Sequence, residues 1–200
     1  MGHLPGCLRD RPCPCAPKDA IGRDLPGRTA SSRLGQVITE HAYPWPDLPR
    51  ELEIQALAFM RIAWGGDEPF RDHVHEGPGS VHFVRSAGNL LISHVRVFII
   101  ETGELRLGGV SGVLTYPQFR GQGHASALMR RAAAHIEQER LDLGMLFCDK
   151  ETEAFYNALG WQALEPGRVL VKDGGDPEDL VMILGEPDVL PEVVELGWSW

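Results

Sequence analysis

Hydrophobic residues recur with helical spacing in two long segments of the chain. The first segment follows Asp47 and Pro49, which suit the start of a helix, and stops at Gly65-Gly66, which suits its end. The second runs from His124 to Arg140. Their apolar side chains, three or four residues apart, are Leu52, Ala56, Phe59 and Ala63 in the first and Ala125, Leu128, Ala132 and Ile136 in the second. This spacing predicts two amphipathic helices, each with one face for a core.

Three runs rich in β-branched and other apolar residues lie between these helices. They are Ser80–Arg85, Asn89–Glu101 and Leu105–Tyr116. Ala87-Gly88 and Thr102-Gly103 separate them, and glycine in such short links favours tight turns. The pattern therefore predicts antiparallel strands joined by hairpins.

Shorter runs complete the predicted architecture. Further strands are expected at Gln36–Glu40, Gly144–Cys148, Arg168–Lys172 and Leu180–Leu184, with a short helix from Asp149 to Gly160. Hairpins followed by a strand-helix-strand unit are typical of an α/β (α+β) fold with a mixed central sheet. Residues 1–33 are rich in Pro, Gly and Arg, so we expect a disordered or non-native N-terminal extension there and one domain over residues 34–200.

The charge of the chain excludes some partners. The 28 acidic and 19 basic residues give a formal net charge of −9, which disfavours nucleic acid, because affinity for nucleic acid depends on neutralising phosphates. Residues 173–200 contain no Lys or Arg, and this acidity serves either solubility or a site for cations. The longest apolar stretch, Asn89–Ile100, is broken by His94 and Arg96, so no membrane span is expected and a cytoplasmic protein is predicted.

Cysteine and histidine spacing predicts neither a disulfide framework nor a metal site. Cys7, Cys13 and Cys15 lie in the N-terminal extension, and Cys148 lies in a presumed buried strand. His73 and His75 have no third ligand at a suitable spacing. We therefore expect no bound metal.

The most informative segment joins the third hairpin strand to the second long helix. It contains Arg120, Gly121, Gln122, Gly123, His124 and Ala125. Small residues let the backbone approach a ligand, the helix start offers unpaired N–H groups, and Arg120 adds a cation. The segment is thus typical of a pyrophosphate cradle, although a tight turn alone would use similar residues.

This segment resembles the acetyl-coenzyme A signature of GNAT N-acetyltransferases, Q/R-x-x-G-x-G/A, through Arg120, Gly123 and Ala125. A second piece, Phe155-Tyr156 followed by Gly160-Trp161, is similar to a helix of the same family. The resemblance implies a splayed sheet with the pantetheine of the cosubstrate acetyl-CoA in the split. It also implies that the cofactor contacts Val113, Leu114 and Thr115, the amides of residues 121–125, and Asn157.

A closer resemblance is to aminoglycoside 2'-N-acetyltransferases. It rests on Leu105–Thr115 running into Phe119-Arg120, on Gly66-Asp67 with Asp72 nearby, and on a terminal tryptophan. That family grips a polycationic drug with carboxylates, since several ammonium groups need several acids. The resemblance implies a cationic amine substrate and possible dimerisation. The implied substrate-binding residues are Asp67, Asp72, Gly112, Asp176, Glu178, Asp179 and Trp200.

One position departs from the aminoglycoside family. Its glutamate general base aligns with Ser111, and a serine hydroxyl is no base by itself. The amine proton could pass through water to His94, to His82 or to a substrate-binding carboxylate, while His94 is equally explained as a satisfied core residue. The resemblance implies that Tyr156 protonates the departing thiolate and that the Val113 N–H polarises the thioester carbonyl.

We therefore expect an acetyl-CoA-dependent N-acetyltransferase that acts on an amine of a polycationic small molecule, with an aminoglycoside as first choice. Two alternatives stay open. One is an acetyltransferase for another amine, such as a polyamine or a peptide N-terminus. The other is an acyl-CoA-binding module without turnover, which the serine at position 111 would suit.

Overall fold

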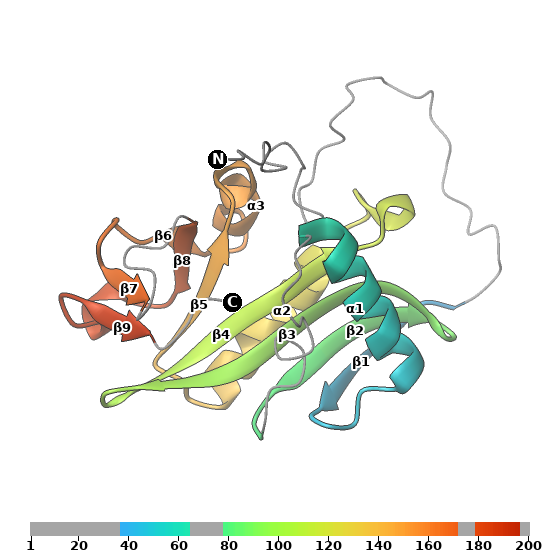
Figure 1. Cartoon of the computed structure of the whole chain (residues 1–200), viewed down its shortest axis with the longest axis horizontal. Coiled ribbons are helices and arrows are strands. Elements are labelled where there is room, and N and C mark those ends of the chain that lie inside the picture. The colour runs from blue at the N-terminus through green and yellow to red at the C-terminus, as the bar shows by residue number, and fades with distance from the viewer. Residues whose placement is uncertain (1–36, 65–77, 172–178, 197–200) are drawn as a thin grey trace, which may run out of the picture.

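A mixed sheet with helices on both faces forms the body of the protein. The computed structural model describes residues 37–64, 78–171 and 179–196. Within these residues seven strands form one sheet in the order β1-β2-β3-β4-β5-β8-β6, and β4 and β5 are its parallel pair. Figure 1 shows α1 in front of this sheet, α2 behind it, and β7 with β9 at one end. The fold class is the one that the sequence predicted.

The bounds of the elements agree with most of the predicted ones. The helices are α1 (Arg50–Trp64), α2 (His124–Gln138) and α3 (Glu153–Asn157). The central strands are β1 (Thr39–Pro44), β2 (Val81–Ala87), β3 (Leu90–Thr102), β4 (Leu105–Thr115), β5 (Leu143–Cys148), β6 (Gln162–Ala163) and β8 (Leu180–Leu184). A second sheet pairs β7 (Val169–Val171) with β9 (Val194–Leu196).

Apolar side chains divide the core between the two faces of the sheet. Leu128, Ala132 and Ile136 of α2 belong to one buried cluster with Val95 and Val97 of β3. A different cluster, on the face that α1 covers, joins the predicted stripe Leu52, Ala56 and Phe59 to Val84 and Leu114. Each fully buried side chain of this size contributes about 1.5–3 kcal/mol. Helical periodicity therefore identified most core-facing positions of both helices, although the predicted Ala63 is only half-buried and lies outside this cluster.

The pairing between β4 and β5 is short, and the two strands then diverge. Their parallel partners are Leu107–Leu143, Gly108–Gly144 and Gly109–Met145, and β4 has no later partner on β5 among the described residues. β4 continues to Thr115, whereas β5 stays paired with β8 up to Cys148. The ends of β4 and β5 accordingly separate in Figure 1. This V-shaped opening is the split that the family resemblance implied.

Some predicted boundaries were wrong, and one predicted strand lies outside the central sheet. The strand expected at Gln36–Glu40 lies instead at Thr39–Pro44. Its position is set by antiparallel pairing with the backbone of β2. The strand expected at Arg168–Lys172 is present as β7, but it pairs with β9 outside the central sheet. The expected helix from Asp149 to Gly160 is a 3-10 turn, Lys150–Thr152, followed by the short helix α3. The expected N-terminal extension, residues 1–33, lies outside the described residues.

Candidate active site

A bulge interrupts β4 beside the opening. His94 of β3 pairs with Leu114 and Arg96 pairs with Ser111, so two residues of β4, Gly112 and Val113, stand opposite one residue of β3. Gly112 has φ of +58°, and a Cβ there would lie 3.0 Å from the His94 ring. Both the backbone conformation and the space therefore require glycine. The bulge places the Gly112–Val113 peptide where β4 has left β5.

Two buried histidines hold this peptide. His94 Nδ1 lies 2.8 Å from the Gly112 carbonyl oxygen, and His94 Nε2 lies 3.0 Å from Nδ1 of His82. Because the carbonyl only accepts, His94 donates from Nδ1, and in the neutral ring Nε2 accepts from the Nδ1–H of His82. Burial lowers the pKa of His94 to about 4, opposed in part by the bond to Gly112 and aided by nearby Arg96. His94 is therefore neutral at pH 7.

Polar side chains line the α1-facing side of the sheet next to the bulge. His94 shares this face with its register partner Leu114, which packs in the α1 cluster, and Arg96 follows two residues later along β3. The Arg96 side chain is 2% exposed, and its guanidinium carbon lies 4.8 Å from the centroid of the Phe98 ring. Ser111 is the register partner of Arg96 and is half-buried. The predicted residues Ser111 and His94 thus lie on one face.

The loop after β4 has open space above its backbone. A 3-10 turn, Pro117–Phe119, leads to Gly121 and Gly123, which have φ of +72° and +76°. A Cβ at either glycine would meet no atom within 4 Å. Gly123 is the N-cap of α2, and no side chain caps the helix there, so its first amides have neither intrahelical partners nor a side-chain cap. An uncapped helix start of this kind favours the binding of an anion, through its free N–H groups and the positive end of the helix dipole.

Arg120 is fixed to the end of β4, while His124 lies beneath the loop. Arg120 Nε donates to the Thr115 carbonyl oxygen over 3.2 Å. His124 is 6% exposed, and its Nδ1 lies 3.3 Å from Nη1 of Arg85, whose Nε donates to Glu40 over 2.8 Å. Burial, with Arg85 as a second cause, lowers the pKa of His124. His124 can therefore offer a ligand its backbone amide, while its buried side chain contacts Arg85 and, edge to face, the Phe119 ring.

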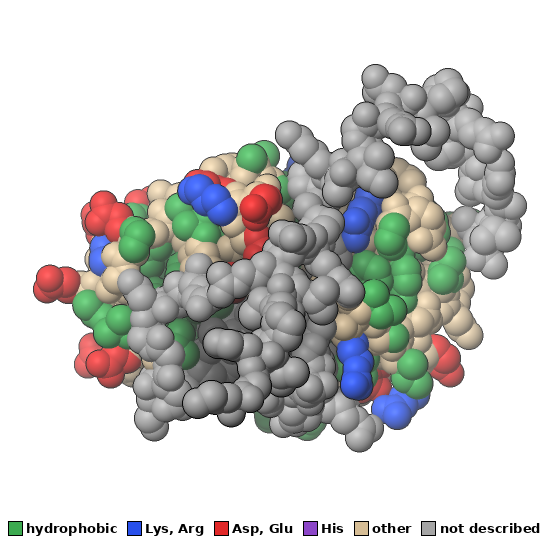
Figure 2. Space-filling view, turned by 45° about the horizontal axis from the view of Figure 1, so that its top comes forward, with side chains coloured by type: hydrophobic (Ala, Val, Ile, Leu, Met, Phe, Trp, Pro, Cys, Tyr) green, Lys and Arg blue, Asp and Glu red, His purple; other side chains and the backbone are tan. Residues whose placement is uncertain are grey.

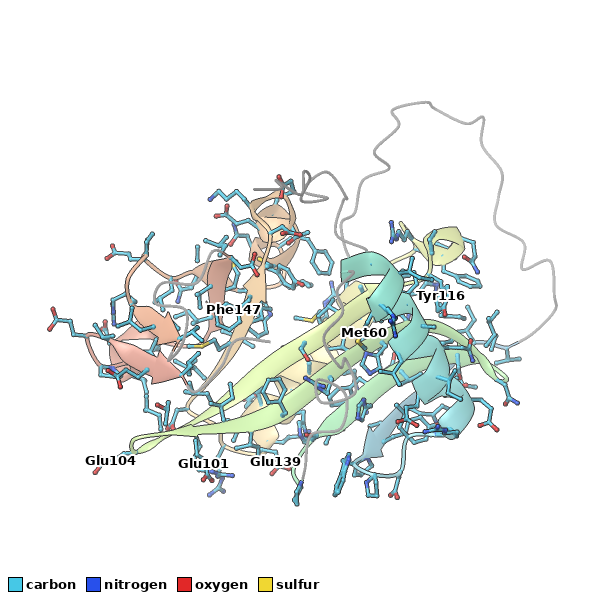
Figure 3. The ribbon with its side chains drawn as sticks, in the orientation of Figure 1. Met60, Glu101, Glu104, Tyr116, Glu139 and Phe147 are labelled. Carbon is cyan, nitrogen blue, oxygen red and sulfur yellow. The ribbon has the colours of Figure 1, made fainter. Side chains whose placement is uncertain are left out.

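Three predicted cofactor contacts lie on the free part of β4. The side chains of Val113, Leu114 and Thr115 are buried, Val113 on the α2 side and Leu114 on the α1 side. Beyond Gly109, β4 has no β5 partner in the described parts of the chain, so the backbone of these residues borders the opening. Figure 3 shows Tyr116, just beyond this segment, and Phe147 of β5 well apart across the divergence.

Tyr156 and Asn157 occupy the short helix α3, beyond the end of β5. Tyr156 is 2% exposed and belongs to the same buried cluster as Val113. Its ring makes an edge contact with Phe155, with 5.0 Å between the ring centroids. Asn157 is exposed and hydrogen-bonds with the side chain of Glu153, whose pKa is lowered chiefly by its bond to Lys150. The structure thus brings Tyr156 and Val113 into one cluster.

A cavity of about 330 Å³ opens at the far end of β5. Asp149, Lys150, Glu165 and Asp179 contribute its charged lining, so acids outnumber bases. Of the predicted substrate-binding acids Asp179 is therefore at a cavity, whereas Asp67, Asp72, Asp176, Glu178 and the terminal Trp200 lie outside the described residues. Figure 2 shows further acidic side chains gathered at the end of the molecule that β7 and β9 form.

The bulge at Gly112–Val113 and the contact between His82 and His94 were not predicted from the sequence. A glycine inside a strand pattern is a signal for a bulge, and Gly112 carried that signal within Leu105–Tyr116. The contact between His82 and His94 depends on the register of β2 against β3, which periodicity does not set. His82 was named only as one of several proton acceptors, and its bond to His94 was not foreseen.

The central region of the sequence matches a known protein family. Residues 79–164 match the family described as the acetyltransferase (GNAT) domain. This part of the chain is therefore similar to a GNAT acetyltransferase domain. The match spans β2 to β6 and so includes the bulge, the loop between β4 and α2, and Tyr156. A comparison with curated protein sequences found no match.

Solved structures share the fold of the GNAT domain at low sequence identity. An acyl-CoA N-acyltransferase from Pseudomonas aeruginosa is 17% identical with a TM-score of 0.59, covering 74% of this chain and all of its own. ElaA from Escherichia coli is 15% identical with a TM-score of 0.58, covering 74% of this chain and 99% of its own. A predicted acetyltransferase with acetyl-CoA from Clostridium acetobutylicum is 15% identical with a TM-score of 0.55, covering 64% and 92%.

Acetyl-CoA is the cosubstrate of GNAT acetyltransferases, and the residues of this domain fit it. The open space over Gly121 and Gly123 and the uncapped start of α2 suit a pyrophosphate. The free edge of β4 suits an extended amide-bearing chain. The described residues contain no group of three or more metal-ligating side chains, and none of their helices has the length and apolarity to cross a membrane.

Proposed function

We propose that this protein transfers the acetyl group of acetyl-CoA to a primary amine by direct attack. One observation carries the proposal: the bulged Gly112–Val113 peptide and the open loop of residues 116–123, which we call the phosphate loop, lie at the same end of β4, beside the split from β5. Bound there, acetyl-CoA would supply an activated acetyl thioester. A site that binds its phosphates on the loop would direct the rest of the molecule along the free edge of β4.

The chain itself would contribute binding and polarisation. The amides of Gly121 to Ala125 and the Arg120 guanidinium would hold the pyrophosphate, and backbone groups of Val113, Leu114 and Thr115 would pair with the pantetheine. The Val113 N–H would donate to the thioester carbonyl, where negative charge develops during attack. A donor fixed in advance costs no reorganisation during the reaction, and the bulge fixes this one.

The proton of the attacking amine needs another acceptor, because Ser111 stands where the similar aminoglycoside acetyltransferases have a glutamate general base. His94 is poorly suited to accept it, because its Nε2 already accepts from His82 and burial holds its pKa at about 4. His82 is buried as well, so water with a carboxylate beside the acceptor amine is the better route. Tyr156, in the cluster that includes Val113, would return a proton to the departing thiolate.

The acceptor amine is proposed to be a cation, with an aminoglycoside as first choice. The acidic lining of the cavity at Asp149, Glu165 and Asp179 supports a cationic ligand at the open end of β5. Asp67, Asp72, Asp176, Glu178 and the Trp200 carboxylate remain proposed partners for further ammonium groups. The guanidinium of Arg96 is buried next to Ser111 and would repel a cation, so the ammonium groups of the substrate are expected away from this part of the sheet.

Release of the coenzyme A thiol tests the proposal. Acetyl-CoA is incubated with the full chain and a panel of amines, namely kanamycin-like aminoglycosides, spermidine and peptides with free N-termini. We expect at least one amine to accelerate release, and the aminoglycosides to do so most. Asp179→Asn should raise KM for a polycationic substrate severalfold, while the exposed β9 variant Glu195→Gln should not. Acetyl-CoA binding without amine-dependent release would instead indicate a binding module.

A further inference from the structure

We infer that His94, held in turn by His82, is a positioning residue for the Val113 N–H. The inference rests on the proposed function of that N–H. It follows from one relationship: the carbonyl of Gly112 and the amide of Val113 belong to the same peptide group. His94 therefore hydrogen-bonds to the carbonyl of the same peptide whose N–H would polarise the thioester.

The direction of the amide follows from the hydrogen bond. The cis peptide of the described residues is Trp45-Pro46, so the Gly112–Val113 peptide is trans and its C=O and N–H point in opposite directions. The carbonyl is directed to His94 on β3, at 2.8 Å. The Val113 N–H is therefore directed away from the His94 ring. At this point β4 has no β5 partner in the described residues, so the peptide borders the opening.

The regular ladder does not supply this orientation. Neither Gly112 nor Val113 has a register partner on β3 or on β5 in the described residues, because the bulge removes the first and the divergence removes the second. Pairing resumes at Leu114, where Ser93 Oγ donates to the Leu114 carbonyl over 2.7 Å. The side chain of His94 thus supplies a hydrogen bond to a peptide whose two residues have no register partner on either neighbouring strand.

The hydrogen bond also strengthens the amide as a donor. An acceptor bond at the carbonyl of a peptide polarises the whole group, and chains of such bonds reinforce one another in a buried site. His82 extends the chain, because its Nδ1–H bonds to His94 Nε2 and thereby keeps the proton of His94 on Nδ1. Both rings are 2% exposed or less, so water does not compete for these bonds.

Two substitutions at position 94 separate positioning from simple packing. The side-chain nitrogen of asparagine can reach the place of His94 Nδ1, so His94→Asn keeps a donor for the Gly112 carbonyl. The amide of glutamine reaches the place of Nε2, so His94→Gln keeps a partner for His82 and loses the bond to Gly112. Each variant loses one of the two buried bonds, and we expect similar losses of stability.

The catalytic readout should differ between them. We expect His94→Gln to lower kcat about tenfold with KM for acetyl-CoA nearly unchanged, because a misdirected donor weakens transition-state stabilisation only. His94→Asn should lose less than about threefold by the same reasoning. His135→Gln, which alters a half-buried histidine on α2, is the matched control. Equal losses of kcat in the Asn and Gln variants, in proportion to their lost stability, would overturn the inference.

A measurement without acetyl-CoA tests the hydrogen bond independently. The amide ¹⁵N resonance of Val113 responds to hydrogen bonding at the preceding carbonyl. We expect it to move in His94→Gln and to stay near its wild-type position in His94→Asn. An unmoved resonance in both variants would overturn the inference even if the enzyme is active. Absence of turnover in the wild type, with the resonance moving as expected, would instead contradict the proposed function alone.

Discussion

The Nε of Arg120 donates to the carbonyl oxygen of Thr115 over 3.2 Å. This bond ties the cation of the phosphate loop to the last residue of β4, and so to the strand that carries the bulge. Ser93 strengthens the same strand end, since its Oγ lies 2.9 Å from Thr115 Oγ1. The proposed phosphate site and the proposed carbonyl donor are therefore positioned by one short segment of backbone.

Replacing Arg120 with alanine should weaken binding of coenzyme A. One charge-assisted hydrogen bond is worth about 1.5–3 kcal/mol, so the Kd should rise about 10- to 100-fold. Isothermal titration calorimetry measures it directly. Arg130→Ala is the control, because Arg130 is exposed on α2 and the charge change is the same. Equal effects of the two variants would mean that Arg120 acts only through the net charge.

Gly123→Ala should reduce both stability and affinity for acetyl-CoA. A side chain at φ of +76° costs about 1–2 kcal/mol, and the added methyl would occupy the space proposed for phosphate. Gly103→Ala is a matched control in the β3–β4 turn, where φ is +59° and the space is also open. Denaturation should show similar destabilisation for both variants, and only Gly123→Ala should raise KM. A raised KM in both would refute a specific role of the loop.

Tyr156→Phe should lower kcat while leaving the affinity for coenzyme A in place. General acid catalysis contributes about 10²-fold or more, and the low end applies here because a thiolate is already a good leaving group. The phenylalanine keeps the ring in its buried cluster, so the fold should persist. Steady-state kinetics and a binding titration test the split. Full activity of the variant would remove the hydroxyl from the mechanism.

Gly109→Ala should destabilise the fold by about 1–3 kcal/mol through overpacking. A Cβ at this position would lie 2.5 Å from Cζ of Phe98. The guanidinium of Arg96 lies over the same ring. Adding Phe98→Leu to this variant should recover part of the loss, because the shorter side chain leaves room for the methyl. Urea denaturation of the single and double variants provides the comparison. Additive losses would show that the two residues are not coupled.

The stability of the protein should fall on acidification partly through His94. Its folded pKa of about 4 lies below the ordinary value of 6.5, so the unfolded chain binds the proton first as the pH falls. The resulting stability is present above pH 6.5 and is lost toward pH 4, by about 3 kcal/mol in total.

Comparison with His94→Asn isolates this contribution. Burial also lowers the pKa values of His124 and His135, which act with the same sign and remain in the variant. The stability gap between wild type and His94→Asn, from urea unfolding at several pH values, should therefore narrow as the pH falls from 7.5 to 4.5. A constant gap would contradict the depressed pKa of His94.

The sequence predicted those features that depend on local pattern. The stripe Leu52, Ala56 and Phe59, the hairpin turns before β3 and β4, and the glycines before α2 each specify structure within a few residues. It could not predict features that depend on long-range pairing. The position of β1 and the pairing of β7 with β9 are fixed by partners far along the chain.

The candidate site divides in the same way. Arg120, Gly123 and Tyr156 stand in recognisable local motifs, so their placement around β4 and α3 was open to prediction. The role of Gly112 depends on a bulge and on the ring of His94, and the protonation of His94 depends on a contact with His82 across two strands. The place of His94 within a predicted strand left a buried core role open but gave no sign of its partners.

Acetyl transfer itself is the most direct test of the proposed function. A single reaction with acetyl-CoA and an aminoglycoside or polyamine is followed both for released coenzyme A thiol and, by mass spectrometry, for the acetylated amine. We expect the two products to appear in equal amounts and to require the amine. Thiol release without an acetylated amine, or no release with any amine in the panel, would contradict an N-acetyltransferase that uses the Val113 amide.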